Sequence, residues 1–150
     1  MGDLMIEVEK ELNISAKDAF DLFSKIIIED IKSSTGKELN KEEIHSGYSY
    51  KKKMKNKLKQ SANVEVLLSI YEPNRVYETQ YISGDGNYTT RYTVEEIDDK
   101  SIKVTYFEEY KANATLSRAN SKLIDFFTKR RNKLIAKQRL ELIEKTVKGM

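Results

Sequence analysis

The chain has 150 residues, of which 39% are hydrophobic and 34% are charged, as in a globular domain with a charged surface. There is no cysteine, which excludes a disulfide, a thiolate nucleophile and a cysteine-based zinc site. A single histidine cannot build an imidazole cluster, and 27 basic against 24 acidic residues leave only a small basic surplus. We therefore expect one domain over residues 1–150, without a metal or cofactor.

The N-terminal residues do not form the basic and then continuously apolar pattern of a secretory signal. No apolar run approaches the ~18 residues that a membrane span requires. We expect a cytoplasmic protein without integral membrane association.

Residues 4–12 alternate with period two, which predicts a strand with one buried face formed by Leu4, Ile6, Val8 and Leu12. Ser15 and Asp18 then resemble a capping box before an apolar pattern of helical spacing. This predicts a helix over residues 16–33, ended by Thr35-Gly36. Asn40 predicts the start of a second, shorter helical turn that ends near Gly47.

The middle of the chain is rich in β-branched residues and tyrosine, separated by turn signals. It predicts strands near residues 47–55, 58–71, 75–83, 87–97 and 101–111. Short connections make neighbouring strands antiparallel, so these strands form a meander. A long helix follows from Leu116 to about Lys148, with an apolar stripe of Leu123, Ile124, Phe127, Leu134, Ile135 and Leu142.

The segment EKELNISAKDAFDLFSKII resembles the entry of the START and birch-pollen-allergen superfamily, the helix-grip fold. More narrowly, DIKSSTGKELNKEEI, GYSYKK, IDDKSIKVTYFEEY and FFTKRRNKLI resemble the bacterial (Firmicutes) family called domain of unknown function 3284. The resemblance implies an α+β fold of order β-α-α-β5-α, with a curved antiparallel sheet wrapped around a long C-terminal helix. It also implies a cavity between the sheet and that helix, which in related families holds lipids, sterols, hormones or polyketides.

The run KKKMKNKLK at residues 51–59 raises the question of nucleic-acid binding. The residues predicted to face the core are Tyr48, Tyr50 and Met54 and, after the turn, Val64, Val66, Leu68 and Ile70. Lys51 and Lys53 then face water, since neighbouring strand residues point to opposite faces. Bases would stack on one face and phosphates would meet the other, so we expect no nucleic-acid partner.

Tyr88, Tyr92 and Tyr106 alternate in step with apolar residues of their strands, which predicts that their side chains point toward the core. The pattern is ambiguous for Tyr77 and Tyr81. On the C-terminal helix, Lys133, Lys137 and Arg139 are expected on the wet face, and Arg131 falls on the apolar stripe. Arg131 either contacts Tyr106 or a ligand anion, or extends to solvent along its own stem. At the standard rise per residue of a helix and of a strand, Arg131 lies too far along its helix to meet the inward-facing Glu108.

The favoured function is binding of an apolar or amphipathic, lipid-like small molecule. The predicted ligand-binding residues are Tyr50, Leu68, Tyr92, Tyr106, Phe127 and Arg131. No catalytic residue is predicted, and His45 is interpreted as a surface or packing residue. Two alternatives remain open: a cyclase- or hydrolase-like enzyme of the same fold, and a protein-interaction module whose core is filled. Formation of a homodimer is also left open.

Overall fold

The computed structural model describes residues 4–55, 61–84, 86–112 and 129–150. Its centre is a six-stranded antiparallel sheet with the strand order β1-β6-β5-β4-β3-β2. The strands are β1 (Leu4–Leu12), β2 (Tyr48–Lys55), β3 (Ser61–Glu72), β4 (Val76–Ile82), β5 (Gly86–Asp98) and β6 (Ser101–Ala112). The first strand therefore pairs with the last one, and β1 and β2 form the two edges.

Helix α1 (Ala16–Thr35) begins at the predicted residue and runs two residues beyond the predicted end at residue 33, up to the predicted stop at Gly36. The hydroxyl of Ser15 accepts a hydrogen bond from the backbone N–H of Asp18 at 3.0 Å, and Gly36 ends the helix with a φ of 78°. The predicted second helical turn is a single 3-10 turn, η1 (Lys41–Glu43). It is held by the backbone N–H of Asn40, which donates to the Glu43 carboxylate at 3.0 Å.

Strand β3 contains a β-bulge that the sequence pattern did not reveal. Leu67 pairs with Gln80, but Ile70 pairs with Glu78, so β3 has one extra residue between these pairs. Val66 and Leu68 face inward, and after the bulge Tyr71 does so, in contact with Phe20. The inward position predicted for Ile70 is therefore wrong, because the bulge reverses the alternation of side chains.

Helix α3 (Lys129–Lys148) buries a different face from the predicted stripe. Leu134, Ile135 and Leu142 are 59%, 40% and 61% exposed. The buried residues are Ala136, Leu140 and Ile143, at spacings of four and three residues. The stripe was wrong because two sets of aliphatic residues share this helix, and the set containing the small Ala136 packs against the rest of the core. The stripe residues Leu123, Ile124 and Phe127 lie outside the described residues.

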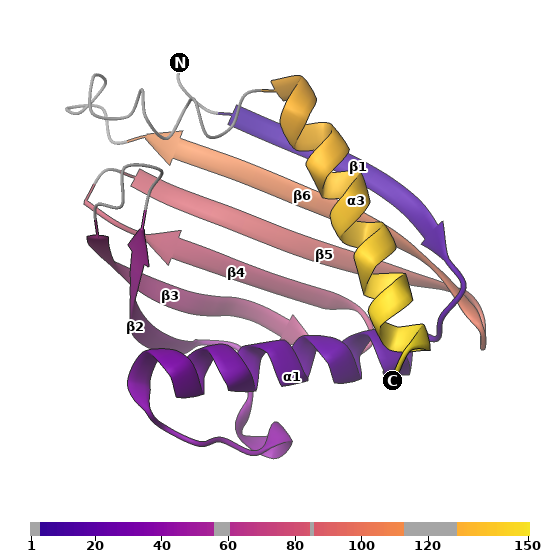
Figure 1. The fold of residues 1–150 in the computed structure, drawn as a ribbon, viewed down its shortest axis with the longest axis horizontal. Helices are drawn as coiled ribbons and strands as arrows, with labels where there is room; N and C mark the ends of the chain where they lie inside the picture. The colour runs from indigo at the N-terminus through magenta and orange to yellow at the C-terminus, as the bar shows by residue number, and fades with distance from the viewer. Residues whose placement is uncertain (1–3, 56–60, 85, 113–128) are drawn as a thin grey trace.

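Both helices lie across one face of the sheet (Figure 1). Helix α3 contacts β1 and β6, whereas α1 contacts β2 and β5 and also touches α3. Phe20 and Phe23 of α1 share one hydrophobic cluster with Val8, Tyr106 and Leu140. This cluster packs the described part of α3 against α1 and the sheet. No helix in the described ranges has the length and apolar character needed to cross a membrane.

Candidate functional site

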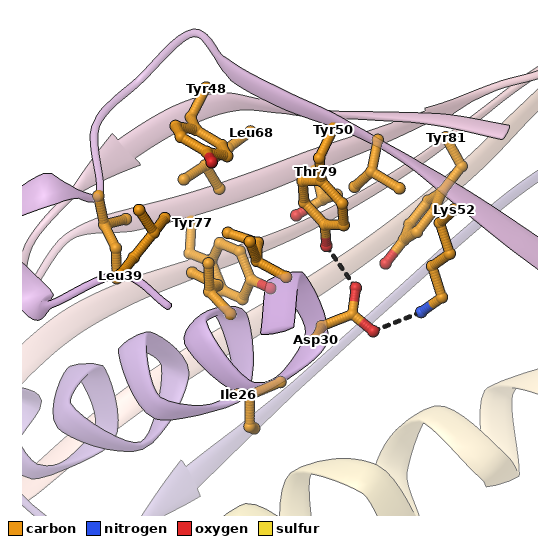
Figure 2. Close-up of a pocket in the computed structure, with 14 residues that line it drawn as sticks. Ile26, Asp30, Leu39, Tyr48, Tyr50, Lys52, Leu68, Tyr77, Thr79 and Tyr81 are labelled. Atoms are coloured by element: carbon orange, nitrogen blue, oxygen red, sulfur yellow. Dashed lines mark hydrogen bonds and ion pairs between the residues drawn. The ribbon is translucent and has the colours of Figure 1, made fainter. Parts of the chain in front are cut away.

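A pocket of about 180 Å³ lies between α1 and strands β2, β3 and β4 (Figure 2). This differs from the expected position between the sheet and the C-terminal helix, where the described side chains pack together. The lining residues are Ile26, Ile27, Asp30, Ile31, Leu39, Ile44, Tyr48, Tyr50, Lys52, Val66, Leu68, Tyr77, Thr79 and Tyr81.

One part of the pocket wall is apolar and buried. Ile31, Leu39, Ile44 and Leu68 belong to one hydrophobic cluster that joins α1 to the loop before β2 and to β3. Each of these four side chains is less than one-tenth exposed. This part of the wall offers only dispersion contacts, so it suits an aromatic or aliphatic group.

Another part of the wall is polar and centred on Asp30 of α1. Its two carboxylate oxygens accept hydrogen bonds from two residues of β2: the Tyr50 hydroxyl binds Oδ2, and the Lys52 ammonium binds Oδ1 at 2.6 Å. The side chains of Asp30 and Lys52 are 27% and 28% exposed, so this pair lies where the pocket meets solvent. Burial is the main cause that raises the pKa of Tyr50, and the hydrogen bond to Asp30 raises it further. The hydroxyl therefore stays protonated and can act as a donor.

Tyr77 and Tyr81 of β4 both point into the pocket, which settles the orientation that the sequence left ambiguous. Figure 2 shows the Tyr81 hydroxyl on the same side of the pocket as Asp30 and Lys52. Burial raises the pKa of both phenols, so they remain neutral near pH 7. The pocket thus combines apolar surface with a few convergent polar groups, the usual make-up of a small-molecule site.

A second cluster of polar side chains, formed by Tyr106, Glu108 and Arg139, connects β6 to α3. The Tyr106 hydroxyl donates to Oε1 of Glu108 at 2.6 Å, and Arg139 donates to the Tyr106 oxygen at 2.7 Å. The guanidinium of Arg139 also lies 3.4 Å from Oε1 of Glu108, and Glu108 is only 6% exposed. This group neutralises a carboxylate buried inside the fold, which would otherwise be costly.

The expected wet-face position of Arg139 is therefore wrong. Its guanidinium reaches inward beside the buried face of α3, where Tyr106 and Glu108 provide hydrogen-bond acceptors. An arginine of this helix does contact Tyr106, as the sequence suggested, but the residue found there is Arg139. The structure describes Arg131 in its backbone alone, so the predicted contact of its side chain lies outside what is described.

Of the predicted ligand-binding residues, Tyr50 and Leu68 line the pocket. Tyr92 and Tyr106 point inward, as predicted, but they pack in the neighbouring core, where Tyr92 contacts Phe23 at 4.9 Å between ring centroids. Phe127 lies outside the described residues. The ligand-binding role of these residues stays a prediction.

Sequence reasoning missed Asp30 and Lys52. A signal for each was present: Asp30 follows Ile27 by three residues and so lies beside the buried stripe of α1, and Lys52 has the same strand parity as Tyr50. The exposure predicted for Lys51 and Lys53 is confirmed. Met54 is 37% exposed, so its predicted core position is wrong; it lies near the end of an edge strand.

A wider and more open groove of about 680 Å³ adjoins the pocket at Ile44. His45 lies on this groove and is exposed, in agreement with its interpretation as a surface residue, and its ring contacts Tyr48 edge-on. Among the described residues, no group of three or more histidine, aspartate or glutamate side chains is arranged to hold a metal ion.

A family model described as "Domain of unknown function (DUF3284)" matches residues 6–129. The chain belongs to this family. A comparison with curated proteins found no match. The family assignment agrees with the resemblance in the sequence, and it brings no established activity.

Solved structures show the same fold at low sequence identity. The Zhui aromatase/cyclase from Streptomyces sp. R1128 is 9% identical, with a TM-score of 0.64 over 97% of this chain and 94% of that chain. Norcoclaurine synthase from Thalictrum flavum is 13% identical, with a TM-score of 0.61 over 97% and 94%. Ara h 8.0201 is 13% identical, with a TM-score of 0.60 over 99% and 100%. The DUF3284 chain thus has the helix-grip fold of the START and birch-pollen-allergen superfamily. Another structure of norcoclaurine synthase contains dopamine and hydroxybenzaldehyde.

The buried tyrosines predict a loss of stability at alkaline pH. Burial raises the pKa of Tyr81, Tyr88, Tyr92 and Tyr106 in the folded protein, whereas in the unfolded chain these residues ionise near pH ~10. The stabilisation is fully present below pH ~10. Above it the unfolded state binds fewer protons, so each such tyrosine lowers the free energy of unfolding by about 1.4 kcal/mol per pH unit.

Urea unfolding between pH 8 and pH 11, followed by circular dichroism, measures this slope. Absorbance at 295 nm reports tyrosine ionisation in the same samples. Ionisation of all nine tyrosines near pH ~10 in a protein that keeps its native circular dichroism would contradict this placement of the phenols.

The contact between Arg139 and Glu108 predicts an energetic coupling between α3 and β6. Replacing Arg139→Met removes the partner of a buried carboxylate and should cost about 1–2 kcal/mol, a value reduced by the partial exposure of Arg139. The double variant with Glu108→Gln should recover part of this loss, because the uncompensated charge is gone. Denaturant unfolding measures the cycle, with Lys137→Met on the exposed face as control. Additive effects of the two substitutions would show that the pair is not coupled.

Proposed function

We propose that this protein binds a small molecule with an apolar body and a polar group in the pocket between α1 and β2–β4. The single observation that carries the proposal is the arrangement of the pocket, with a buried aliphatic wall and the Asp30–Tyr50–Lys52 group near solvent. The apolar body would lie against Leu39, Ile44 and Leu68. The polar group would remain close to Lys52.

The volume limits the size of the guest. A protein cavity of about 150 Å³ accommodates benzene, so about 180 Å³ suits a single substituted ring or a short aliphatic chain. Drug-sized ligands usually occupy pockets of about 300 Å³ or more. A sterol or a long acyl chain would therefore require side chains of the pocket to move. The one-ring molecules bound by norcoclaurine synthase are of the size that fits here.

Catalysis is a second candidate, favoured by one observation. The carboxylate of Asp30, the ammonium of Lys52 and the Tyr50 hydroxyl meet at one wall of the pocket, and such groups can act in proton transfer. Mass spectrometry of a compound recovered from the protein after incubation separates the two candidates. A binding protein returns the compound unchanged, whereas an enzyme returns a product.

Filling the pocket should abolish binding without disrupting the fold. In Leu68→Phe the larger ring would occupy the space beside Leu39 and Ile44, with a loss of stability of about 1–3 kcal/mol from overpacking. Thermal-shift screening of one-ring aromatic compounds should give stabilisation of the wild type that Leu68→Phe lacks. The matched control is Leu67→Phe, which adds the same ring on the opposite face of β3.

Leu39→Phe provides a second obstruction from the other side of the pocket. Equal ligand-induced shifts in the wild type and in both filled variants would place binding elsewhere. If no compound shifts the wild type at all, and native mass spectrometry of gently purified protein finds no bound molecule, the proposal fails.

A further inference from the structure

Asp30 and Lys52 are the only charged residues that line the pocket in the described part of the chain. Their charges are opposite, and Oδ1 and Nζ are 2.6 Å apart. The lining therefore has no net charge. Its remaining polar groups are the hydroxyls of tyrosine and threonine side chains.

We propose that the Asp30–Lys52 pair makes the pocket selective for neutral molecules with a hydrogen-bonding group, such as alcohols, phenols or carbonyl compounds. This inference rests on the proposed function and narrows the class of ligand. Selectivity of this kind arises from what the pair excludes as much as from what it binds.

A ligand of either charge is repelled by one member of the pair. A cationic group that approaches Asp30 must compete with Lys52, and an anionic group that approaches Lys52 must compete with Asp30. In both cases the incoming charge lies beside a residue of the same sign in a partly buried site, which opposes binding. A neutral polar group meets no such repulsion.

Donors for a neutral group are available at this wall. The ammonium of Lys52 has three N–H donors and uses one on Asp30. The hydroxyl of Tyr81 makes no hydrogen bond to another residue within the described ranges, and Figure 2 shows it beside the Asp30–Lys52 pair. The hydroxyl of Tyr50 is already committed to Asp30. An incoming oxygen can therefore accept from Lys52 or Tyr81 while the ion pair stays intact.

The alternative is that the pair serves only to attach β2 to α1. In that case its charges would have no influence on which compounds bind. Exchanging one charge at a time distinguishes a selective pair from a purely structural one.

The experiment compares benzyl alcohol, benzylamine and benzoate at pH 7, which place a neutral, a positive and a negative group on the same ring. Dissociation constants come from titrations followed by nuclear magnetic resonance. For the wild type we expect benzyl alcohol to bind about tenfold more tightly than either charged compound, a difference typical of one unfavourable charge in a partly buried site.

Two variants should move the preference in opposite directions. Asp30→Asn leaves Lys52 without its anion, so benzoate should gain relative to benzyl alcohol by about tenfold. Lys52→Met leaves Asp30 without its cation, so benzylamine should gain by a similar factor. Glu29→Gln and Lys51→Met are the controls, since they change the net charge by the same amounts at neighbouring exposed positions. Lys52→Met alone carries the test if Asp30→Asn does not fold.

Equal binding of the three compounds by the wild type, or an unchanged preference in folded variants, would overturn this inference. The proposed function would stand in that case, because compounds still bind the pocket. If benzyl alcohol and benzene both fail to bind the wild type, and the screen of one-ring compounds also finds no ligand, then the proposed function itself is wrong.

Discussion

The attachment of β2 to α1 through Asp30 is the interaction on which the pocket depends. β2 is an edge strand with a single paired neighbour in the sheet, and its outward lysines repel one another. The Asp30 carboxylate accepts hydrogen bonds from Tyr50 and Lys52, two residues apart on the same face of this strand. These bonds hold the edge strand against the helix. They also place the polar groups of the pocket at its contact with solvent.

Tyrosine contributes much of the inner surface beside the buried aliphatic residues, and all nine tyrosines lie on the face of the sheet that the helices cover. One cross-strand row joins Tyr106, Tyr92, Tyr77 and Tyr71 on β6, β5, β4 and β3. A second row contains Tyr110, Tyr88 and Tyr81 and reaches Tyr50 across Val66. Glu108, Thr90 and Thr79 form a polar row between them. Each phenol adds a large apolar ring and one hydrogen-bonding atom, which explains how one surface supplies both a packed core and a polar pocket.

The sequence predicted those features that depend on neighbours along the chain. The alternation of β1, the Ser15 cap, the Gly36 end of α1 and the order of the meander are all local patterns, and the structure has them. The inward parity of Tyr92 and Tyr106 could also be predicted, because apolar neighbours two residues away set the face. The family resemblance supplied the global topology that local patterns leave open.

Features that depend on distant contacts were not predictable in the same way. The hydroxyl of Ser69 in the β3 bulge donates to the carboxylate of Glu78 on the next strand and so stabilises the bulge. No local sequence pattern predicts this bulge. The buried face of α3 was misassigned because Leu134 and Leu142 are as apolar as Leu140, and only packing decides between them. Asp30 and Lys52 are 22 residues apart, so their pairing appears only once β2 lies on α1.

The central claim is that small molecules enter the space between α1 and β2–β4. Methyl nuclear magnetic resonance of isoleucine and leucine side chains during titration with benzyl alcohol tests it most directly. The account predicts saturable shifts at Ile27, Ile31, Leu39 and Leu68, with unchanged signals from the exposed Ile97, Leu134 and Leu142. Shifts confined to the exposed methyl groups, or the absence of any saturable shift at the pocket residues, would contradict it.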